Sequence, residues 1–350
     1  MKIPKFLKSF EAYKSQYLSG LARLYNQCLD PSSLVTIVAC NSLRSSWSQF
    51  SPEELVESFR LSLREFEKIE RQNSSMKMAP EDKAVFDAML SQGSNEFLEP
   101  AIERRVGPFV AGLFPFRNLR PVNEDSDKSI GRYTDYDPKK DALFAQQSIK
   151  DECFWTGEID SIPTWVFPNK FPNLTGHSLF VPWPEQRLYQ EMTETVHNWI
   201  WDLVETVGNC IPSFSMGFNS IGAGATQKQL HLQATVESDT FPVSEEVWAH
   251  NGGSRIYPGQ VEVSLSKLEA WKAITSICLS SDTITYCLLY LPGKIFILPG
   301  KPRGLCQIPW WGTGVGFCDR AGRITVSNRE AFEQVSEGEI ETVLKSWSVI

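Results

Sequence analysis

The sequence lacks the features that mark several common classes of protein. Its eight cysteines are spread over 350 residues without a Cys-x-x-Cys pair, and it has only four histidines, so neither a disulfide framework nor a structural zinc site is indicated. No apolar run is long enough to cross a bilayer, and the first residues form no continuous apolar segment of the secretory kind. These absences predict a cytoplasmic protein with reduced, mostly buried thiols and no membrane partner.

Basic charge is also scarce. The formal net charge is -8, from 34 Lys and Arg against 42 Asp and Glu, and no basic stripe stands out. This balance argues against a nucleic-acid partner held through its phosphates, whereas a small anionic substrate needs only a local positive site. The 11 tryptophans are enough to supply flat stacking surface for a base as well as core.

The most informative segment present runs from Gly217 to Gln233. It opens with glycines and small residues, which let backbone N–H groups approach a ligand, and it ends with alternating polar and apolar residues. In a strand, Gln229, His231 and Gln233 would share one face while the leucines between them fill the core. An imidazole with an unperturbed pKa of about 6.5 is available as a nucleophile, and a nearby amide can donate to a phosphoryl oxygen. We therefore predict attack on phosphorus by His231; the alternative is a structural histidine on a half-buried strand.

The first hundred residues show a helical pattern. Aromatic and leucine residues at helical spacing between 6 and 27, and a helix start at Ser51-Pro52, predict a helical N-terminal region over 1–104. From Val106 a strand-like run follows and ends with Arg117 and Arg120. Guanidinium groups leaving a strand can clamp a phosphate or lie on a solvated edge.

Two later segments repeat one pattern. The residues from Thr164 to Pro182 predict two strands joined by a turn rich in Pro, Asn and Gly, and an amphipathic helix follows over 188–207. Residues 283–302 repeat the order strand, turn, strand, Pro in shorter form, which indicates two related half-domains. We place them at about 105–260 and 261–350.

Three further elements are predicted from local signals. The acidic loop over 237–259 is interpreted as a lid or insertion with an exposed His250. Near the end of the chain, residues 319–322 predict a hairpin turn, and Ser336-Glu337-Gly338-Glu339 forms a capping box that opens a helix.

The chain resembles the histidine-triad (HIT) superfamily in its phosphorylase and nucleotidyltransferase branch. Asn169-Lys170-Phe171-Pro172, then Gly176-His177 and Leu179-Phe180-Val181-Pro182, is similar to the hairpin that holds the nucleoside there. The segment from Gly217 to Gln233, with its spacing from Asn219 to His231, most resembles the active-site segment of the GDP-hexose phosphorylases, including GDP-L-galactose phosphorylase. Diadenosine tetraphosphate phosphorylases and galactose-1-phosphate uridylyltransferases are also similar. The resemblance covers roughly residues 105 to 345.

The resemblance implies a fold and a mechanism. The fold would be α+β, with a HIT-like antiparallel sheet and helices over 105–350, preceded by the helical N-terminal region. His231 would attack the α-phosphorus and form a covalent nucleotidyl-histidine, while Gln233 donates to a nonbridging oxygen. Most relatives have histidine where this chain has Gln229, whose backbone carbonyl would orient the other ring nitrogen of His231. A hydrolase of the superfamily would carry histidine at 233, so Gln233 favours transfer to phosphate.

The expected substrates are a nucleotide or nucleotide-sugar and inorganic phosphate, with a GDP-hexose-like substrate first. The alternatives are a dinucleoside polyphosphate phosphorylase and a non-catalytic nucleotide-binding module. No cofactor is required, and magnesium would serve only as a helper that neutralises the phosphates. The expected substrate-binding residues are Asn169, Lys170, His177, Asn219, Gly222, Ala223, Thr226, Arg117, Arg120 and Lys301.

Overall fold

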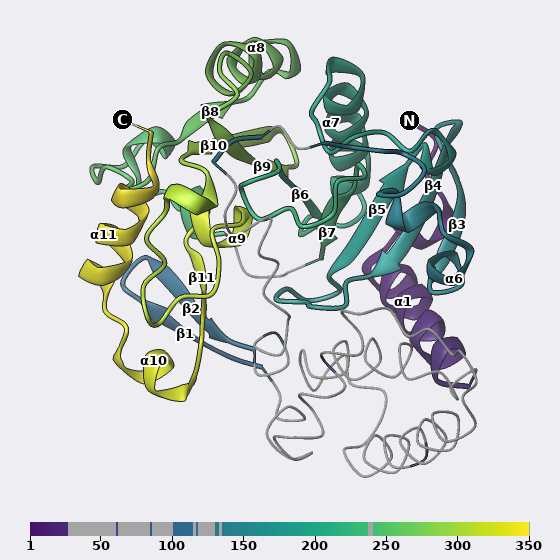
Figure 1. The fold of residues 1–350 in the computed structure, drawn as a ribbon, viewed down its shortest axis with the longest axis horizontal. Coiled ribbons are helices and arrows are strands. Elements are labelled where there is room, and N and C mark those ends of the chain that lie inside the picture. The colour runs from purple at the N-terminus through teal and green to yellow at the C-terminus, as the bar shows by residue number, and fades with distance from the viewer. Residues whose placement is uncertain are drawn as a thin grey trace.

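An antiparallel sheet of eight strands lies at the centre of the computed structural model, which describes residues 1–26, 61, 85, 101–114, 117, 130–132, 135–236 and 241–349 (Figure 1). The strand order is β3-β4-β5-β7-β6-β9-β10-β8. The strands are β3 (Trp155–Ile159), β4 (Ile162–Pro168), β5 (Ser178–Pro182), β6 (Ser215–Asn219), β7 (Leu232–Thr235), β8 (Glu262–Ser264), β9 (Thr285–Leu291) and β10 (Lys294–Gly300). The predicted α+β class with an antiparallel sheet is confirmed.

A smaller sheet packs beside the large one. It consists of β1 (Ile102–Val106), β2 (Phe109–Leu113) and β11 (Arg323–Val326), with β11 parallel to β2. The helices near it are α9 (Phe317–Arg320), α10 (Arg329–Gln334) and α11 (Glu337–Trp347). In Figure 1 this sheet lies with α10 and α11 on the left, β3, β4, β5 and α1 lie on the right, and β6 and β7 lie between them.

The remaining helices are α1 (Phe10–Asn26), α6 (Gln147–Lys150), α7 (Glu194–Gly208) and α8 (Lys267–Ala273), which a π-helical turn continues over Ile274–Cys278. Residues of α1, α7 and α8 pack in one core cluster against one face of the large sheet. The opposite face packs against the small sheet and α11 in a second cluster. Because side chains alternate along a strand, Leu288 lies in the first cluster and its neighbour Leu289 in the second.

Most elements predicted from local patterns are confirmed. The hairpin at 164–182 is β4 paired antiparallel with β5, and β9 with β10 forms the second hairpin. The helix predicted over 188–207 begins at Glu194, with Thr193 as its N-cap. The capping box of α11 forms as expected between Ser336 and Glu339.

Two predictions about local structure are wrong: the hairpin at 319–322 and the exposure of His250. Residues 319–322 form no hairpin, because Phe317–Arg320 is a short helix and the next strand is parallel to β2. The carboxylate of Asp319 accepts from the backbone N–H groups of Gly316 and Thr325, which fixes this turn from helix to strand. His250 is half-buried, and its Nε2 lies 2.8 Å from the carbonyl oxygen of Val243.

The segment that carries His250 is not an open lid. Trp248 and Tyr257 are buried in the second core, and the His250 ring contacts the rings of Tyr257 and Phe296. Acidic residues between aromatic ones resemble a loop in the sequence, but the aromatic side chains here are part of the hydrophobic core. The described residues of 237–259 are therefore packed against the fold and do not form a lid.

The N-terminal region is described only in part. The helix predicted between 6 and 27 is confirmed as α1, whose Tyr13 hydroxyl donates to the carbonyl oxygen of Gly176 at 2.8 Å. The helix start at Ser51 and the residues up to 100, apart from 61 and 85, lie outside the described residues. The division at 104 and the two half-domains remain predictions.

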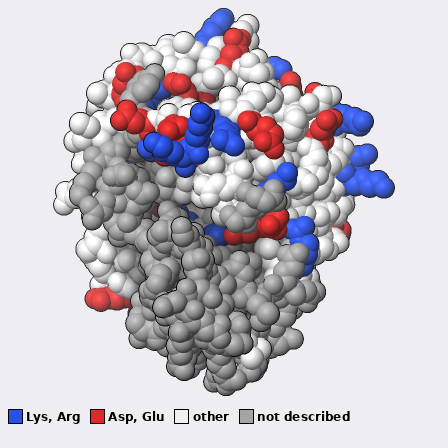
Figure 2. All heavy atoms as spheres, turned by 45° about the vertical axis from the view of Figure 1, so that its right-hand side comes forward, with Lys and Arg blue, Asp and Glu red and all other residues white. Residues whose placement is uncertain are grey.

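Six cysteines within the described ranges are free, and four of them are buried; Cys28 and Cys40 lie outside these ranges. No helix among the described residues has the length and apolar character needed to cross a bilayer. On the face shown in Figure 2, described Lys and Arg side chains lie among Asp and Glu.

Candidate active site

His231 lies just before β7, in the middle of the large sheet. It is 6% exposed, and the ring of Phe144 packs against the imidazole with 5.4 Å between ring centroids. Its Nδ1 is 2.8 Å from the carbonyl oxygen of Gln229. Because a carbonyl oxygen can only accept, Nδ1 carries the proton and the lone pair lies on Nε2. The imidazole is thus held in the tautomer that a nitrogen nucleophile requires.

The predicted strand over Gln229, His231 and Gln233 is shorter in the structure, because β7 begins at Leu232 and leaves His231 one residue outside it. β6 and β7 pair from Ser215↔Thr235 to Gly217↔Gln233, and the side chain of Gln190 lies beyond the last pair. Gln190 Oε1 accepts from His231 N at 2.8 Å, and Gln190 Nε2 donates to His231 O at 3.1 Å. Gln190 is not recognisable from the sequence, because a glutamine in a polar stretch before a helix has no pattern that marks it as a partner of a distant strand.

The side chain of Gln229 does not share an open face with His231 and Gln233, as the strand pattern predicted. It is fully buried: Oε1 accepts from Phe144 N at 2.9 Å, and Nε2 donates to Pro184 O at 3.3 Å. The reason is that Gln229 lies before the start of β7, so the alternation of side chains along that strand does not extend to it. Its amide hydrogen-bonds to the backbone of Phe144, whose ring packs against His231.

Gln233 is held by a buried histidine. Nε2 of His177 lies 2.9 Å from Gln233 Oε1, and His177 Nδ1 accepts from the backbone N–H of Asn173 at 3.3 Å. Burial, with a smaller contribution from the charge of Arg117, lowers the pKa of His177 to about 3. The ring is therefore neutral near pH 7, with its proton on Nε2. It donates to Gln233 Oε1, which leaves the Gln233 NH₂ group as a donor.

The nucleoside-hairpin residues predicted from sequence lie close to this histidine. Asn169 Oδ1 accepts from Phe171 N, and Asn169 Nδ2 lies 3.1 Å from His177 Nε2; both of these nitrogens carry hydrogen in the assigned tautomer, so the second is a close contact and not a hydrogen bond. Lys170 forms an ion pair with Glu152 at 2.9 Å. Arg117 donates to Phe171 O, and burial lowers its pKa. Arg120 lies outside the described residues.

The glycine-rich loop approaches the site from β6. Asn219 is buried, and its Oδ1 accepts from Phe317 N at 2.8 Å. The Ala223 N–H donates to Ser220 O at 3.0 Å, so this N–H is already used within the loop.

The other residues predicted on the substrate side are placed as follows. Gly222 has a φ of +77° and accepts from Arg303 N at 2.8 Å through its carbonyl. Thr226 is half-buried in the same loop. Lys301 Nζ donates to the carbonyl oxygen of Ser346 at 2.8 Å, at the end of α11.

A second glycine-rich segment, residues 312–316, contacts the first. A Cβ on Gly224, whose φ is +104°, would lie 3.0 Å from Gly316 Cα, so the two backbones touch. A Cβ on Gly217 would lie 2.7 Å from atoms of the Phe317 ring. The spacing Gly312-x-Gly314-x-Gly316 was a signal that could have pointed to this contact.

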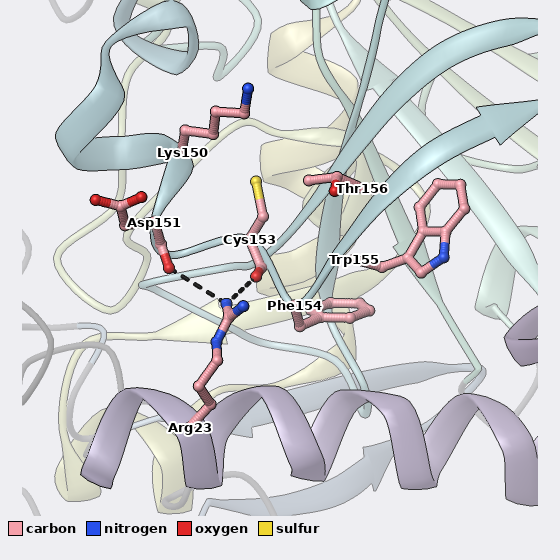
Figure 3. Close-up of a pocket in the computed structure, with 7 residues that line it drawn as sticks. All are labelled: Arg23, Lys150, Asp151, Cys153, Phe154, Trp155 and Thr156. Atoms are coloured by element: carbon pink, nitrogen blue, oxygen red, sulfur yellow. Dashed lines mark hydrogen bonds between the residues drawn. The ribbon is translucent and has the colours of Figure 1, made fainter. Parts of the chain in front are cut away.

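A cavity of about 520 Å³ lies away from His231, between α1 and β3 (Figure 3). Arg23, Lys150 and Trp155 are among its described lining residues, which include neither His231 nor Gln233. Arg23 points its guanidinium at the carbonyl oxygens of Asp151 and Cys153, so backbone acceptors already engage it.

Nowhere in the described parts of the chain do three His, Cys, Asp or Glu side chains group in a way that could hold a metal ion. The hydrogen-bond partners of His231 include the side chain of Gln190 and the carbonyl oxygen of Gln229.

Comparison with known proteins agrees with this architecture. Residues 133–235 match the family model described as GDPGP1-like, N-terminal domain. The fold is similar to that of yeast Ap4A phosphorylase Apa2 in complex with Ap4A, with a TM-score of 0.53 and 14% identity over 79% of this chain and 100% of that chain. The same protein in complex with AMP gives 0.51 and 15%, over 76% and 95%. A search of curated proteins finds no match.

These findings confirm the predicted resemblance to GDP-hexose phosphorylases and to diadenosine tetraphosphate phosphorylases, and they show a fold shared with the latter. The matched range contains His177, Gln229, His231 and Gln233.

Proposed function

We propose that this chain is a nucleotide phosphorylase that acts through a covalent nucleotidyl-histidine at His231. One observation carries the proposal: the carbonyl oxygen of Gln229 accepts from Nδ1 of His231, which leaves the lone pair of the imidazole on Nε2. The motif side chains of Gln229 and Gln233 are amides, which can neither deprotonate water nor protonate an alkoxide. This chemistry suits exchange between phosphate oxygens, which leave and attack as anions.

In the first step, Nε2 of His231 attacks the α-phosphorus of the substrate. The N–P bond forms while the P–O bond to the leaving group breaks, and the leaving group takes that electron pair. A sugar 1-phosphate or nucleotide leaves as a stable anion, since the second pKa of a phosphate monoester is about 6. No proton donor is needed, so the buried amide of Gln229 is compatible with turnover.

In the second step, an oxygen of inorganic phosphate attacks the nucleotidyl group. The new P–O bond forms, and the N–P bond breaks with its electron pair returning to His231 Nε2. Gln233 would donate its NH₂ hydrogens to a nonbridging oxygen in both steps, because His177 holds the other end of that amide. The product is a nucleoside diphosphate when the nucleotidyl group is a nucleoside monophosphate.

A GDP-hexose-like substrate is the first candidate, supported by the GDPGP1-like family match over the segment that carries the site. A dinucleoside polyphosphate is the second, suggested by the fold shared with a phosphorylase solved with Ap4A. Magnesium would act as a counter-ion held by the substrate phosphates. Both substrate classes use the same two steps.

The test is phosphate-dependent turnover. GDP-hexoses, ADP-sugars and dinucleoside polyphosphates are each incubated with the full chain and phosphate, and nucleoside diphosphate is measured by chromatography. Turnover should be lost in His231→Ala and kept in His250→Ala, a histidine packed in the second core. Activity that survives in His231→Ala contradicts the mechanism. Nucleotide binding without turnover on any substrate supports the non-catalytic module instead.

A further inference from the structure

We infer that Gln190 is a positioning residue for His231, acting through the backbone on both sides of the nucleophile. This inference rests on the proposed function. Gln190 is 2% exposed and lies where the pairing of β6 with β7 ends. Its side chain lies where the same register, continued by two residues beyond Gly217↔Gln233, would place Asn219 opposite His231.

Three hydrogen bonds define this arrangement. Gln190 Oε1 accepts from His231 N at 2.8 Å. Gln190 Nε2 donates to Asn219 O at 2.9 Å and to His231 O at 3.1 Å. The amide thus lies between the two strand ends and pairs with backbone groups of both, which are costly to bury without partners.

The backbone around Gln190 also pairs with the backbone around Gln229. Gln190 N donates to Lys228 O and Leu230 N donates to Leu188 O, both at 2.7 Å, and an isolated bridge joins Tyr189 to Gln229. This short ladder fixes the peptide that contains Gln229 O, the acceptor for His231 Nδ1. The segment 188–190 therefore contacts both sides of the nucleophile: its main chain pairs beside Gln229, and the side chain of Gln190 holds the backbone of His231 in register with the Gln229 carbonyl.

The chemistry of the side chain explains why glutamine fits here. The position requires one acceptor and two N–H donors in a single plane, all buried. A carboxylate provides acceptors only, an ammonium group provides donors only, and methionine provides neither at similar length. A protonated glutamic acid at this position would keep one acceptor and one donor.

The experiment compares Gln190→Met and Gln190→Glu with a matched control, Gln16→Met. Gln16 on α1 also donates from a half-buried amide to a backbone carbonyl, that of Phe154 at 2.7 Å, but it does not contact His231. Two readouts are used on the full chain: steady-state phosphorolysis, and the tautomer of His231 from ¹⁵N–¹H NMR on histidine-labelled protein.

We expect Gln190→Met to lower kcat about 10–100-fold with KM for phosphate within about twofold, because misplacement of a reacting group affects the transition state most. Gln190→Glu should lie between wild type and Gln190→Met, and Gln16→Met should stay within about twofold of wild type. The Nδ1–H form of His231 should dominate in wild type and lose that dominance in Gln190→Met.

The outcomes separate the two proposals. If wild type shows no turnover, the proposed function fails, while the tautomer measurement still tests the role of Gln190. An unchanged His231 tautomer in folded Gln190→Met and Gln190→Glu would overturn the inference. Equal losses of kcat in Gln190→Met and Gln16→Met would overturn it as well, since they would show a general effect of removing a buried amide.

Discussion

Replacing His177 with glutamine should make the protein less sensitive to acid. His177 is fully buried and its pKa is about 3, whereas the ordinary value is 6.5. Between these two values the unfolded chain binds a proton at this position and the folded protein does not. Stability that depends on the neutral ring is therefore complete above pH 6.5 and is lost as the pH falls towards 3.

The size of the effect follows from the two pKa values. Each pH unit between them changes the free energy of unfolding by about 1.4 kcal/mol. Lowering the pH from 7.5 to 5.0 crosses about 1.5 units of this range, so His177 alone should contribute a loss of about 2 kcal/mol. Glutamine does not titrate, yet it still offers a donor towards Gln233 and an acceptor towards Asn173.

Urea unfolding followed by tryptophan fluorescence at pH 7.5 and 5.0 measures this difference. The acid-induced loss in His177→Gln should be smaller than in wild type by about 2 kcal/mol. A His250→Gln control keeps His177 and should keep that part of the loss. Equal acid-induced losses in wild type and His177→Gln would refute the neutral buried imidazole, and with it our account of how Gln233 is oriented.

Three further substitutions test separate contacts. Gln233→Leu removes the proposed donor to the phosphoryl oxygen and should lower kcat/KM for phosphorolysis about 10²-fold; a value within twofold of wild type would exclude that role. Gly217→Val places a Cβ 2.7 Å from the Phe317 ring and should cost about 1–3 kcal/mol in urea unfolding, so an unchanged midpoint would show that the ring is free to move. Tyr13→Phe removes the bond that ties α1 to Gly176 and should cost about 1 kcal/mol at unchanged kcat, whereas a large loss of kcat would connect α1 to the chemistry.

Elements that depend on neighbours in sequence could be predicted. The hairpin of β4 and β5 and the capping box at Ser336 are encoded by turn residues and caps within a few positions, and both form as expected. The tautomer-setting contact from Gln229 O to His231 was also expected from the family resemblance. These features need little information from the rest of the chain.

Features that depend on distant partners could not be predicted in the same way. Gln190 is 41 positions from His231, and Gln229 is 85 positions from Phe144, so no local pattern connects them. The short helix Phe317–Arg320 and the hairpin predicted at 319–322 have similar turn residues in the sequence. The hydrogen bonds of the Asp319 carboxylate decide between them. In each case the tertiary fold supplies the partner that decides the local structure.

Trapping the nucleotidyl-enzyme is the most direct test of the central claim. The full chain is mixed with nucleotide-sugar or dinucleoside polyphosphate in the absence of phosphate, and the intact mass and then the modified peptide are measured. We predict a nucleotide adduct on the peptide that contains His231, absent in His231→Asn and released as nucleoside diphosphate when phosphate is added. An adduct that persists in His231→Asn, or turnover with phosphate through a single step that never labels wild-type protein, would contradict the mechanism.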